Sequence, residues 1–284
     1  MEDTIIQSIY KKCISNIDHI SIFIFFYILT LLYVCFGNHI FFIQFDERVY
    51  LSSINTWNQF DIATVYNISG ENKTIFFLYI QKILGANIIY TRILNVLLII
   101  GTMYLLYSLS GNKLAFLYPL IILFLNSMWL TVEIIEVFIM LLGFKYLKNH
   151  MGVAVGLACL FRPYAVIYSL FMDKRNMIYI IIIGLSACAI LYMNDVLFIY
   201  AELMIGYGSN GIQNKLDTVD TYSLFLLIPL IIAGYKNWHY SKYAFAGMVG
   251  LSVQMFAHYF IVPYTFFYLA YLTKGIVQNA KRTT

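Results

Sequence analysis

Long apolar runs, separated by short polar stretches, extend along almost the whole chain. Several runs approach the roughly 20 residues that one helix needs to cross a hydrocarbon core. The runs are continuous instead of alternating every second residue, which favours helices over the strands of a membrane barrel. We therefore predict an all-α fold, a polytopic helical membrane protein of about eight spans plus one helical hairpin. The predicted spans are 20–43, 88–109, 114–127, 130–147, 176–193, 221–235, 241–257 and 259–273.

The hairpin is predicted over 151–172, where the apolar pattern is interrupted. Basic residues flank this stretch on both sides, and Arg162-Pro163 stands in its middle. The residue before a proline is biased away from helical backbone, so the chain should break there. We expect a helical hairpin that enters and leaves the membrane on one side, with Arg162 near its tip.

Composition supports the membrane assignment. Of the 284 residues, 61% are apolar and 11% are charged, and the mean hydropathy is +0.77. A soluble domain of this size does not bury so much apolar surface. The interpretation is a single transmembrane domain over 1–284, in which the first apolar run is a retained signal anchor. Four cysteines lie in or beside apolar stretches without metal-ligand spacing, which favours a packing role.

The distribution of Lys and Arg predicts a topology with both termini in the cytoplasm, because cytoplasmic loops of membrane proteins carry an excess of these residues. The net charge of +4 therefore does not indicate nucleic-acid binding. The residues expected inside are Lys11, Lys12, Lys113, Lys145, Lys148, Lys174, Arg175, Lys236, Lys242, Lys274, Lys281 and Arg282. Those expected outside are Arg48, Lys73, Lys82, Arg92 and Lys215.

Two outer segments follow from this topology. The first, 44–87, contains two semi-apolar stretches, 46–60 and 74–84, that we expect to be helices lying in the membrane interface. The second outer loop is 194–220 and includes a glycine-rich turn.

The first outer segment opens with Asp46-Glu47, directly after the first apolar run. Such a pair could present an acid or base at the lipid–water boundary, or it could cap the next helix.

Four motifs in a fixed order carry a resemblance. They are Asp46-Glu47-x-x-Tyr50, the segment 86–94 (AlaAsnIleIleTyrThrArgIleLeu), Gly152-x-x-x-Gly156 running on to Arg162-Pro163, and 258–264 (HisTyrPheIleValProTyr). Together they resemble the GT-C class of integral-membrane glycosyltransferases. The nearest branch contains the aminoarabinose transferases of lipid A and the protein O-mannosyltransferases. The resemblance covers about 40–175 and is weaker at 258–270.

This resemblance implies transfer of a sugar from a polyprenyl- or dolichyl-phosphate carrier, on the outer face of the membrane, to a lipid, glycan or protein acceptor. Asp46 matches the acidic position of the first outer loop that engages the acceptor, and Glu47 could share this work or hold a divalent cation. Lys73 stands in a segment similar to one whose lysine contacts the carrier phosphate, although the prolines of that segment are missing here. A snorkelling role for Lys73 is equally open.

Arg92 and Arg162 are charges at membrane depth, which cost roughly 2.5–3.5 kcal/mol each on insertion scales. A guanidinium matches phosphate oxygens, so both are candidates for binding the donor phosphate. Arg162 could instead form a salt bridge with Glu133 or Glu136, which are three residues apart on one helix face. For these two acids, metal binding, substrate hydroxyl binding and an arginine partner all stay open. His258 could touch phosphate or sugar, or be an interfacial residue.

The alternatives come from other classes. A transporter or flippase of a lipid-linked sugar would use the same basic cavity without bond cleavage. A non-catalytic subunit of a membrane complex, or a polymerase or ligase of surface glycans, is also open. Relatives of the resembled class often carry more spans and a soluble outer domain. The chain is therefore expected to need a partner subunit or to be a minimal version. The metal, the sugar and the acceptor are not fixed by the residues.

Overall fold

The computed structural model describes residues 29, 75–85, 87–124, 131–199, 201, 228, 231–232, 237–251 and 260–273. About 90% of this part of the chain is helical and it contains no strand, which confirms the all-helical class. The main elements are α5 (Ile75–Ile83), α6 (Ile88–Ser110), η1 (Lys113–Leu117), α7 (Tyr118–Phe124), α8 (Val132–Leu142), η2 (Gly143–Leu147), η3 (Lys148–His150), α9 (Met151–Phe161), η4 (Pro163–Phe171), α10 (Lys174–Met193), α13 (Trp238–Leu251) and α14 (Ile261–Leu272).

Two helices, α6 and α10, are long and apolar enough to cross a membrane. They match the predicted spans 88–109 and 176–193 within two residues. Asn87 begins α6 by accepting a hydrogen bond from the N–H of Ile89 at 2.8 Å. Gly111 ends α6 in the left-handed conformation, with φ 62°. The number of about eight spans stays a prediction.

Other predicted spans are built from shorter pieces. The stretch predicted as 114–127 contains η1 followed by α7, and 130–147 contains α8 followed by the π-helical segment η2. The described part of 241–257 belongs to α13, and α14 accounts for most of 259–273. The predicted spans 20–43 and 221–235 lie outside the described residues except at 29, 228 and 231–232, and the interfacial stretch 46–60 lies wholly outside. The second stretch predicted as an interfacial helix, 74–84, contains α5, and its position in the membrane interface stays a prediction.

The predicted break in 151–172 is present. Helix α9 ends at Phe161, and Arg162 has extended backbone with φ −139° and ψ 98°. Pro163 then opens the 3₁₀ helix η4, which packs back against α9. Eleven α-helical residues and nine 3₁₀ residues are about 16 Å and 18 Å long. Both arms are too short to cross a hydrocarbon core of about 30 Å. This is consistent with a hairpin that enters and leaves the membrane on the same side.

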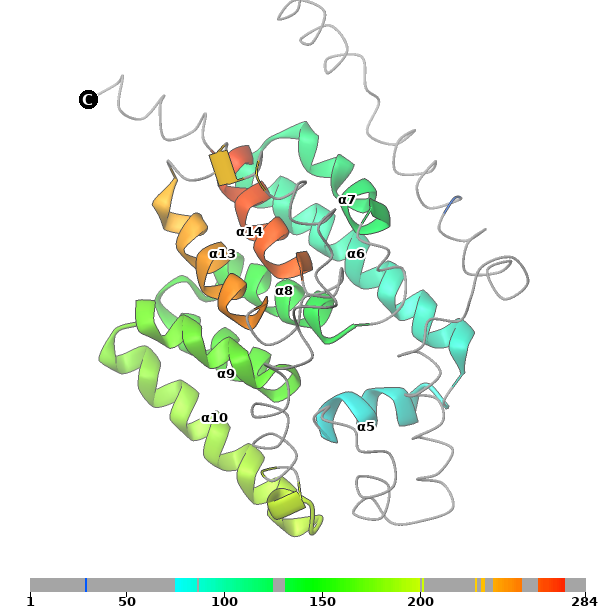
Figure 1. Ribbon diagram of the computed structural model, residues 1–284, viewed down its shortest axis with the longest axis vertical. Helices are drawn as coiled ribbons and strands as arrows, with labels where there is room; N and C mark the ends of the chain where they lie inside the picture. The colour runs from blue at the N-terminus through cyan, green and yellow to red at the C-terminus, as the bar shows by residue number, and fades with distance from the viewer. Residues whose placement is uncertain are drawn as a thin grey trace, which may run out of the picture.

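Helix α8 lies at the centre of the described bundle. It packs against α6, α9 and α14, and α9 in turn packs against α10, while α13 packs against α14 (Figure 1). Val137, Met140 and Leu141 of α8 are fully buried in the core, together with Phe266 and Phe267 of α14. Because α8 and α9 form consecutive, antiparallel arms, the end of α9 returns to the start of α8.

Glycines allow α9 to approach both neighbours closely. A Cβ on Gly143 would lie 2.5 Å from the Cβ of Ala154 in α9. A Cβ on Gly152 would lie 2.0 Å from the backbone oxygen of Asn176 in α10. The space at Gly152 is used for a hydrogen bond, since its N–H donates to Asn176 Oδ1 at 2.6 Å. The predicted Gly152-x-x-x-Gly156 motif is thus the surface on which α10 packs.

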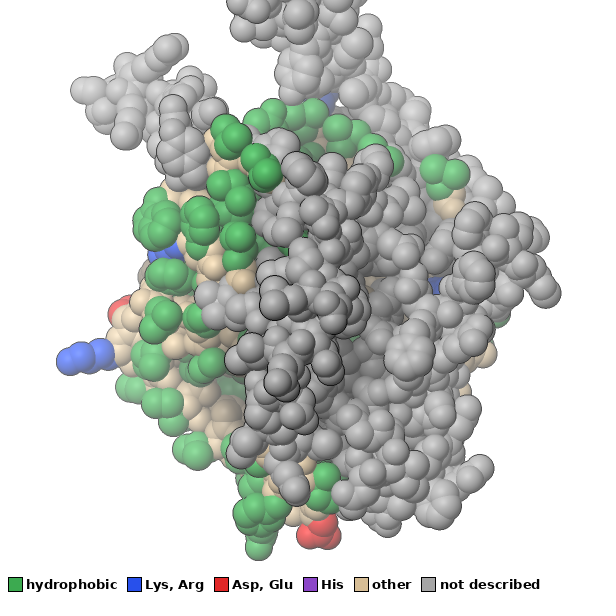
Figure 2. Space-filling view, viewed as in Figure 1, with side chains coloured by type: hydrophobic (Ala, Val, Ile, Leu, Met, Phe, Trp, Pro, Cys, Tyr) green, Lys and Arg blue, Asp and Glu red, His purple; other side chains and the backbone are tan. Residues whose placement is uncertain are grey.

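Helix α10 packs on α9 with a narrow stripe and leaves most of its apolar surface outside. Asn176, Ile180 and Leu191 are buried at helical spacing. Ile178, Ile181, Ile182 and Leu185 are exposed. Hydrophobic side chains also cover much of the described surface that Figure 2 shows. Exposed apolar surface of this extent is the expected property of a helix that faces lipid.

Candidate functional site: a buried acid–base cluster at the hairpin break

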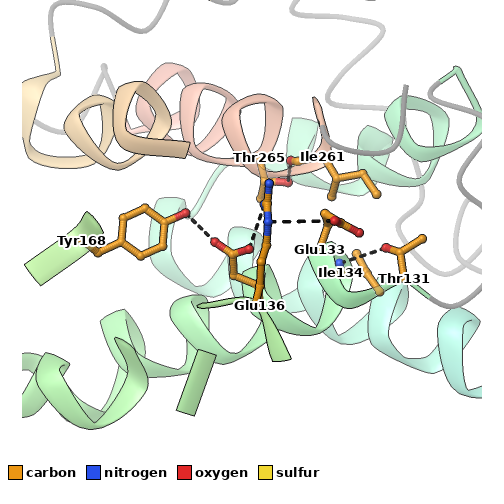
Figure 3. Close-up of polar contacts among 8 residues, drawn as sticks. Thr131, Glu133, Ile134, Glu136, Tyr168, Ile261 and Thr265 are labelled. Carbon is orange, nitrogen blue, oxygen red and sulfur yellow. Dashed lines mark hydrogen bonds and ion pairs between the residues drawn. The ribbon is translucent and has the colours of Figure 1, made fainter. Parts of the chain in front are cut away.

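Four polar side chains, those of Glu133, Glu136, Arg162 and Tyr168, meet where the hairpin breaks. Arg162 Nη1 donates to Glu136 Oε2 at 2.9 Å, and Tyr168 OH donates to Glu136 Oε1 at 2.6 Å. Arg162 Nε lies 3.9 Å from Glu133 Oε1. Figure 3 shows the hydroxyl of Tyr168 pointing toward the carboxylate of Glu136. We call these four residues the acid–base cluster.

Local sequence explains how each member reaches the cluster. Thr131 caps α8, its hydroxyl accepting from the N–H of Ile134 at 3.3 Å. Glu133 then lies in the first turn of α8, where the helix dipole favours a negative charge. Glu136 follows one turn later on the same face. Arg162 stands at the end of α9, which the antiparallel packing of α9 on α8 returns to this turn.

All members are inside the protein. Glu133 and Glu136 expose 0% and 1% of their surface, Arg162 exposes 4% and Tyr168 exposes 1%. Removing charges from water is costly, and an ion pair offsets this only when geometry is good and further hydrogen bonds satisfy the groups. Glu136 meets that condition, because each of its oxygens accepts a hydrogen bond. The cluster therefore fixes the break of the hairpin to the start of α8.

Of the alternatives for Glu133 and Glu136, an arginine partner is the one observed. Among the residues that the structure describes, no group of three or more His, Cys, Asp or Glu side chains could hold a metal ion. Whether Arg162 also meets a donor phosphate stays a prediction.

Arg92 is a second buried cation, with 1% of its surface exposed. It lies in the first turns of α6, on the same buried face as Asn95 and Thr102. Since α6 packs against α8, Arg92 belongs to the helix next to the one that carries both acids. Its burial agrees with the expectation that a charge on such a helix turns into the protein and not into lipid.

Four of the predicted site residues, Asp46, Glu47, Lys73 and His258, lie outside the described residues. The structure brings Glu133, Glu136 and Arg162 together, and it places Arg92 on the neighbouring helix. The proximity of Asp46 to Arg162, on which the enzymatic interpretation depends, stays a prediction.

Tyr168 was not among the predicted site residues. A 3₁₀ helix has three residues per turn, so Arg162, Ala165 and Tyr168 fall on one face, and all three are buried. Two features of the sequence could have indicated Tyr168: the proline that follows Arg162, and the spacing of three residues between Arg162, Ala165 and Tyr168. A buried pair of hydroxyls, Tyr118 OH and Thr265 Oγ1, 2.8 Å apart, was not predicted either. This pair joins α7 to α14, where Thr265 also donates to the carbonyl of Ile261 at 2.7 Å.

No family model, no curated protein and no solved structure matches the chain. Over the residues that the structure describes, the chain is helical, contains two helices able to cross a membrane, and holds a buried acid–base cluster at a helix break. The resemblance to the GT-C class rests on the motifs in the sequence alone.

Proposed function

We propose that the chain is a membrane glycosyltransferase of the GT-C type, which moves a hexose or pentose from a polyprenyl- or dolichyl-phosphate donor to an acceptor on the outer face. One observation supports the proposal most: the guanidinium of Arg162 lies at the break of a short hairpin and is held there by Glu136. A guanidinium fixed in this way is suited to the phosphate that leaves with the lipid, because preorganised cations stabilise developing negative charge.

In the proposed reaction, Asp46 accepts the proton of an acceptor hydroxyl as its oxygen attacks the anomeric carbon. The bond between that carbon and the phosphate oxygen breaks, the configuration inverts, and the lipid phosphate leaves with the bonding electron pair. Arg162, Arg92, Lys73 and His258 would bind the phosphate. Glu136 and Tyr168 would act as positioning residues by fixing the guanidinium.

Sidedness is part of the same proposal. The chain would be multi-pass, with both termini in the cytoplasm and the acid–base cluster toward the outer face. A divalent cation and a partner subunit stay open, and chelation and co-purification would test them directly.

The test is a transfer assay with the purified full-length chain in lipid nanodiscs. Radiolabelled polyprenyl-phosphate sugars and a membrane lipid extract are added, and label is followed from donor to acceptor. Asp46→Asn and Arg162→Ala should each abolish transfer. Arg175→Ala, which removes an exposed arginine, is the matched control and should keep it. Transfer that survives both site changes would contradict the assignment of the site.

A transporter or flippase of a lipid-linked sugar is the second candidate, favoured by one observation. A buried charge at a helix break is also how transporters build substrate sites at membrane depth. The two functions separate in one experiment. If no donor supports transfer, but the protein moves a fluorescent polyprenyl-phosphate sugar across vesicle bilayers in an Arg162-dependent way, the transporter is correct.

A further inference from the structure

The end of the bundle opposite the acid–base cluster is formed by helix ends that come from distant parts of the chain. Lys145 Nζ donates to the carbonyl of Ser108, in the last turn of α6, at 3.5 Å. Asn176, in the first turn of α10, donates through Nδ2 to the carbonyl of Asn149 at 3.3 Å. The end of α6, the link between α8 and α9, and the start of α10 therefore meet.

The C-terminal helices join the same end. Asn112, just after α6, lies 3.5 Å through its Nδ2 from the carbonyl of Leu272 at the end of α14. Asn237, just before α13, donates through Nδ2 to Thr273 Oγ1 at 2.7 Å. The contacts thus gather the boundaries of α6, α9, α10, α13 and α14 on one side of the molecule.

This side is basic. We define the basic end by its Lys and Arg residues, which are Lys113, Lys145, Lys148, Lys174, Arg175 and Lys242. Asp173 is the one acidic residue that the described chain places here, and its carboxylate accepts hydrogen bonds from the N–H and Nδ2 of Asn176. Figure 2 shows Lys or Arg side chains projecting at the edge where α9 and α10 join. The described acids other than Asp173 lie in the acid–base cluster or after the far end of α10.

Exposed aromatic and apolar side chains border the basic end. Tyr146 and Trp238 expose 70% and 60% of their surface. Within two turns of Lys174 and Arg175 the exposed apolar face of α10 begins, at Ile178. Tyrosine, tryptophan and basic residues at the foot of a lipid-facing helix are the usual composition of a membrane interface. A nucleic acid or an acidic soluble protein would leave this apolar face uncovered.

We propose that the basic end binds the phosphate headgroups of anionic phospholipids, while the exposed face of α10 contacts their acyl chains. Lys148, Lys174 and Arg175 are exposed and close together in the structure because the hydrogen bonds of Asn176 hold α9 and α10 at their junction. Each basic residue near an anionic membrane surface strengthens binding by about fivefold. The proposal does not require glycosyl transfer, because it concerns the end of the bundle away from the cluster.

The test measures retention of defined lipids by the full-length protein in detergent. Phosphatidylglycerol or phosphatidylcholine is titrated, and bound lipid is counted by native mass spectrometry. The variant Lys148→Gln/Lys174→Gln/Arg175→Gln removes the exposed charges. Lys174 and Arg175 stand in the first turn of α10, where positive charge is unfavourable, so their removal should not unfold the helix. Lys148→Gln is compared singly with Lys82→Gln, an exposed lysine on α5.

The wild type should retain phosphatidylglycerol over phosphatidylcholine, and the triple variant should bind it roughly 100-fold more weakly. Lys148→Gln should weaken binding about fivefold and Lys82→Gln should not. Raising the salt concentration should weaken wild-type binding, because screening shortens the reach of exposed charges. Equal retention of the two lipids, or equal losses in the two single variants, would overturn the proposal. Displacement of the lipid by millimolar inorganic phosphate would show a free-phosphate site and would also overturn it.

Loss of lipid binding and loss of transfer are separable. Arg162→Ala should abolish transfer and leave phosphatidylglycerol retention at the wild-type level. A parallel loss of both, in Arg162→Ala protein that a thermal unfolding transition shows to be folded, would mean that the lipid occupies the acid–base cluster, and the basic end would then be excluded as its site.

Discussion

Glu136 in α8 and Arg162 at the end of α9 are joined by a hydrogen bond of 2.9 Å between carboxylate and guanidinium, across 26 positions of sequence. The pair closes the loop formed by α8, η2, η3 and α9, and it is almost wholly shielded from solvent. The break in the hairpin therefore has a fixed position relative to the central helix. This relationship has consequences for stability whether or not the chain is an enzyme.

Arg162→Ala should lower the free energy of unfolding by about 3–5 kcal/mol, because it leaves a buried carboxylate without its compensating charge. Replacing both members, as Arg162→Met with Glu136→Leu, should recover part of this loss, since the carboxylate of the pair is then removed together with its partner, while Glu133 stays buried. Denaturant titration in detergent micelles measures both. Losses that simply add in the double variant would show that the two side chains do not interact.

Tyr168→Phe should cost about 1.5–3 kcal/mol, the usual range for a hydrogen bond to a charged group. The change removes only the hydroxyl that donates to Glu136 at 2.6 Å and keeps the ring. The ring packs edge-on against Tyr243 and Phe266. Tyr146→Phe, at an exposed position, is the matched control and should change stability by less than about 0.5 kcal/mol. Equal effects at the two positions would mean that the hydroxyl of Tyr168 contributes nothing.

The sequence was sufficient for features that depend on local chemistry. The two long apolar runs at α6 and α10 and the helix break before Pro163 were predicted, and a salt bridge of Arg162 with Glu133 or Glu136 was one of the alternatives left open. Each follows from a rule that acts within a few residues: hydropathy, the restriction before proline, and the cost of an unpaired buried charge.

Features that depend on tertiary packing were not predicted. A run of apolar residues does not indicate where a helix is interrupted. The stretch 114–127 was therefore expected as one span, although it contains the 3₁₀ helix η1 followed by α7. Tyr168 resembles any other tyrosine of the chain until η4 folds back and its three-residue period turns the hydroxyl toward Glu136. The role of Asn176 likewise exists only because α10 lies against the start of α9.

Gly152→Ala should destabilise the protein, because the new methyl group would meet the backbone oxygen of Asn176 at 2.0 Å and backbone does not move as easily as a side chain. Overpacking of this kind costs about 1–3 kcal/mol. Gly184→Ala is the matched control, since nothing lies within 4 Å of its added Cβ. Alanine is the better helix former, so Gly184→Ala should stabilise by about 0.5–1 kcal/mol. The same unfolding titration compares the two, and a stabilised Gly152→Ala would contradict the observed packing of α9 on α10.

The Asp173 cap predicts a pH dependence at the start of α10. The N–H of Asn176 donates to the carboxylate of Asp173 at 2.8 Å. This hydrogen bond, and to a smaller extent the one from the Asn176 side chain, lowers the pKa of Asp173 below its ordinary value. A lowered pKa in the folded state means a stabilising contribution that is present above the unfolded pKa of about 3.9 and is lost as the pH falls through the folded pKa. The wild type should therefore lose stability below about pH 4 relative to Asp173→Asn, because asparagine keeps a capping oxygen but does not titrate. Thermal unfolding midpoints of the two proteins between pH 7 and pH 3 measure this difference, and parallel curves would exclude the carboxylate as a source of stability.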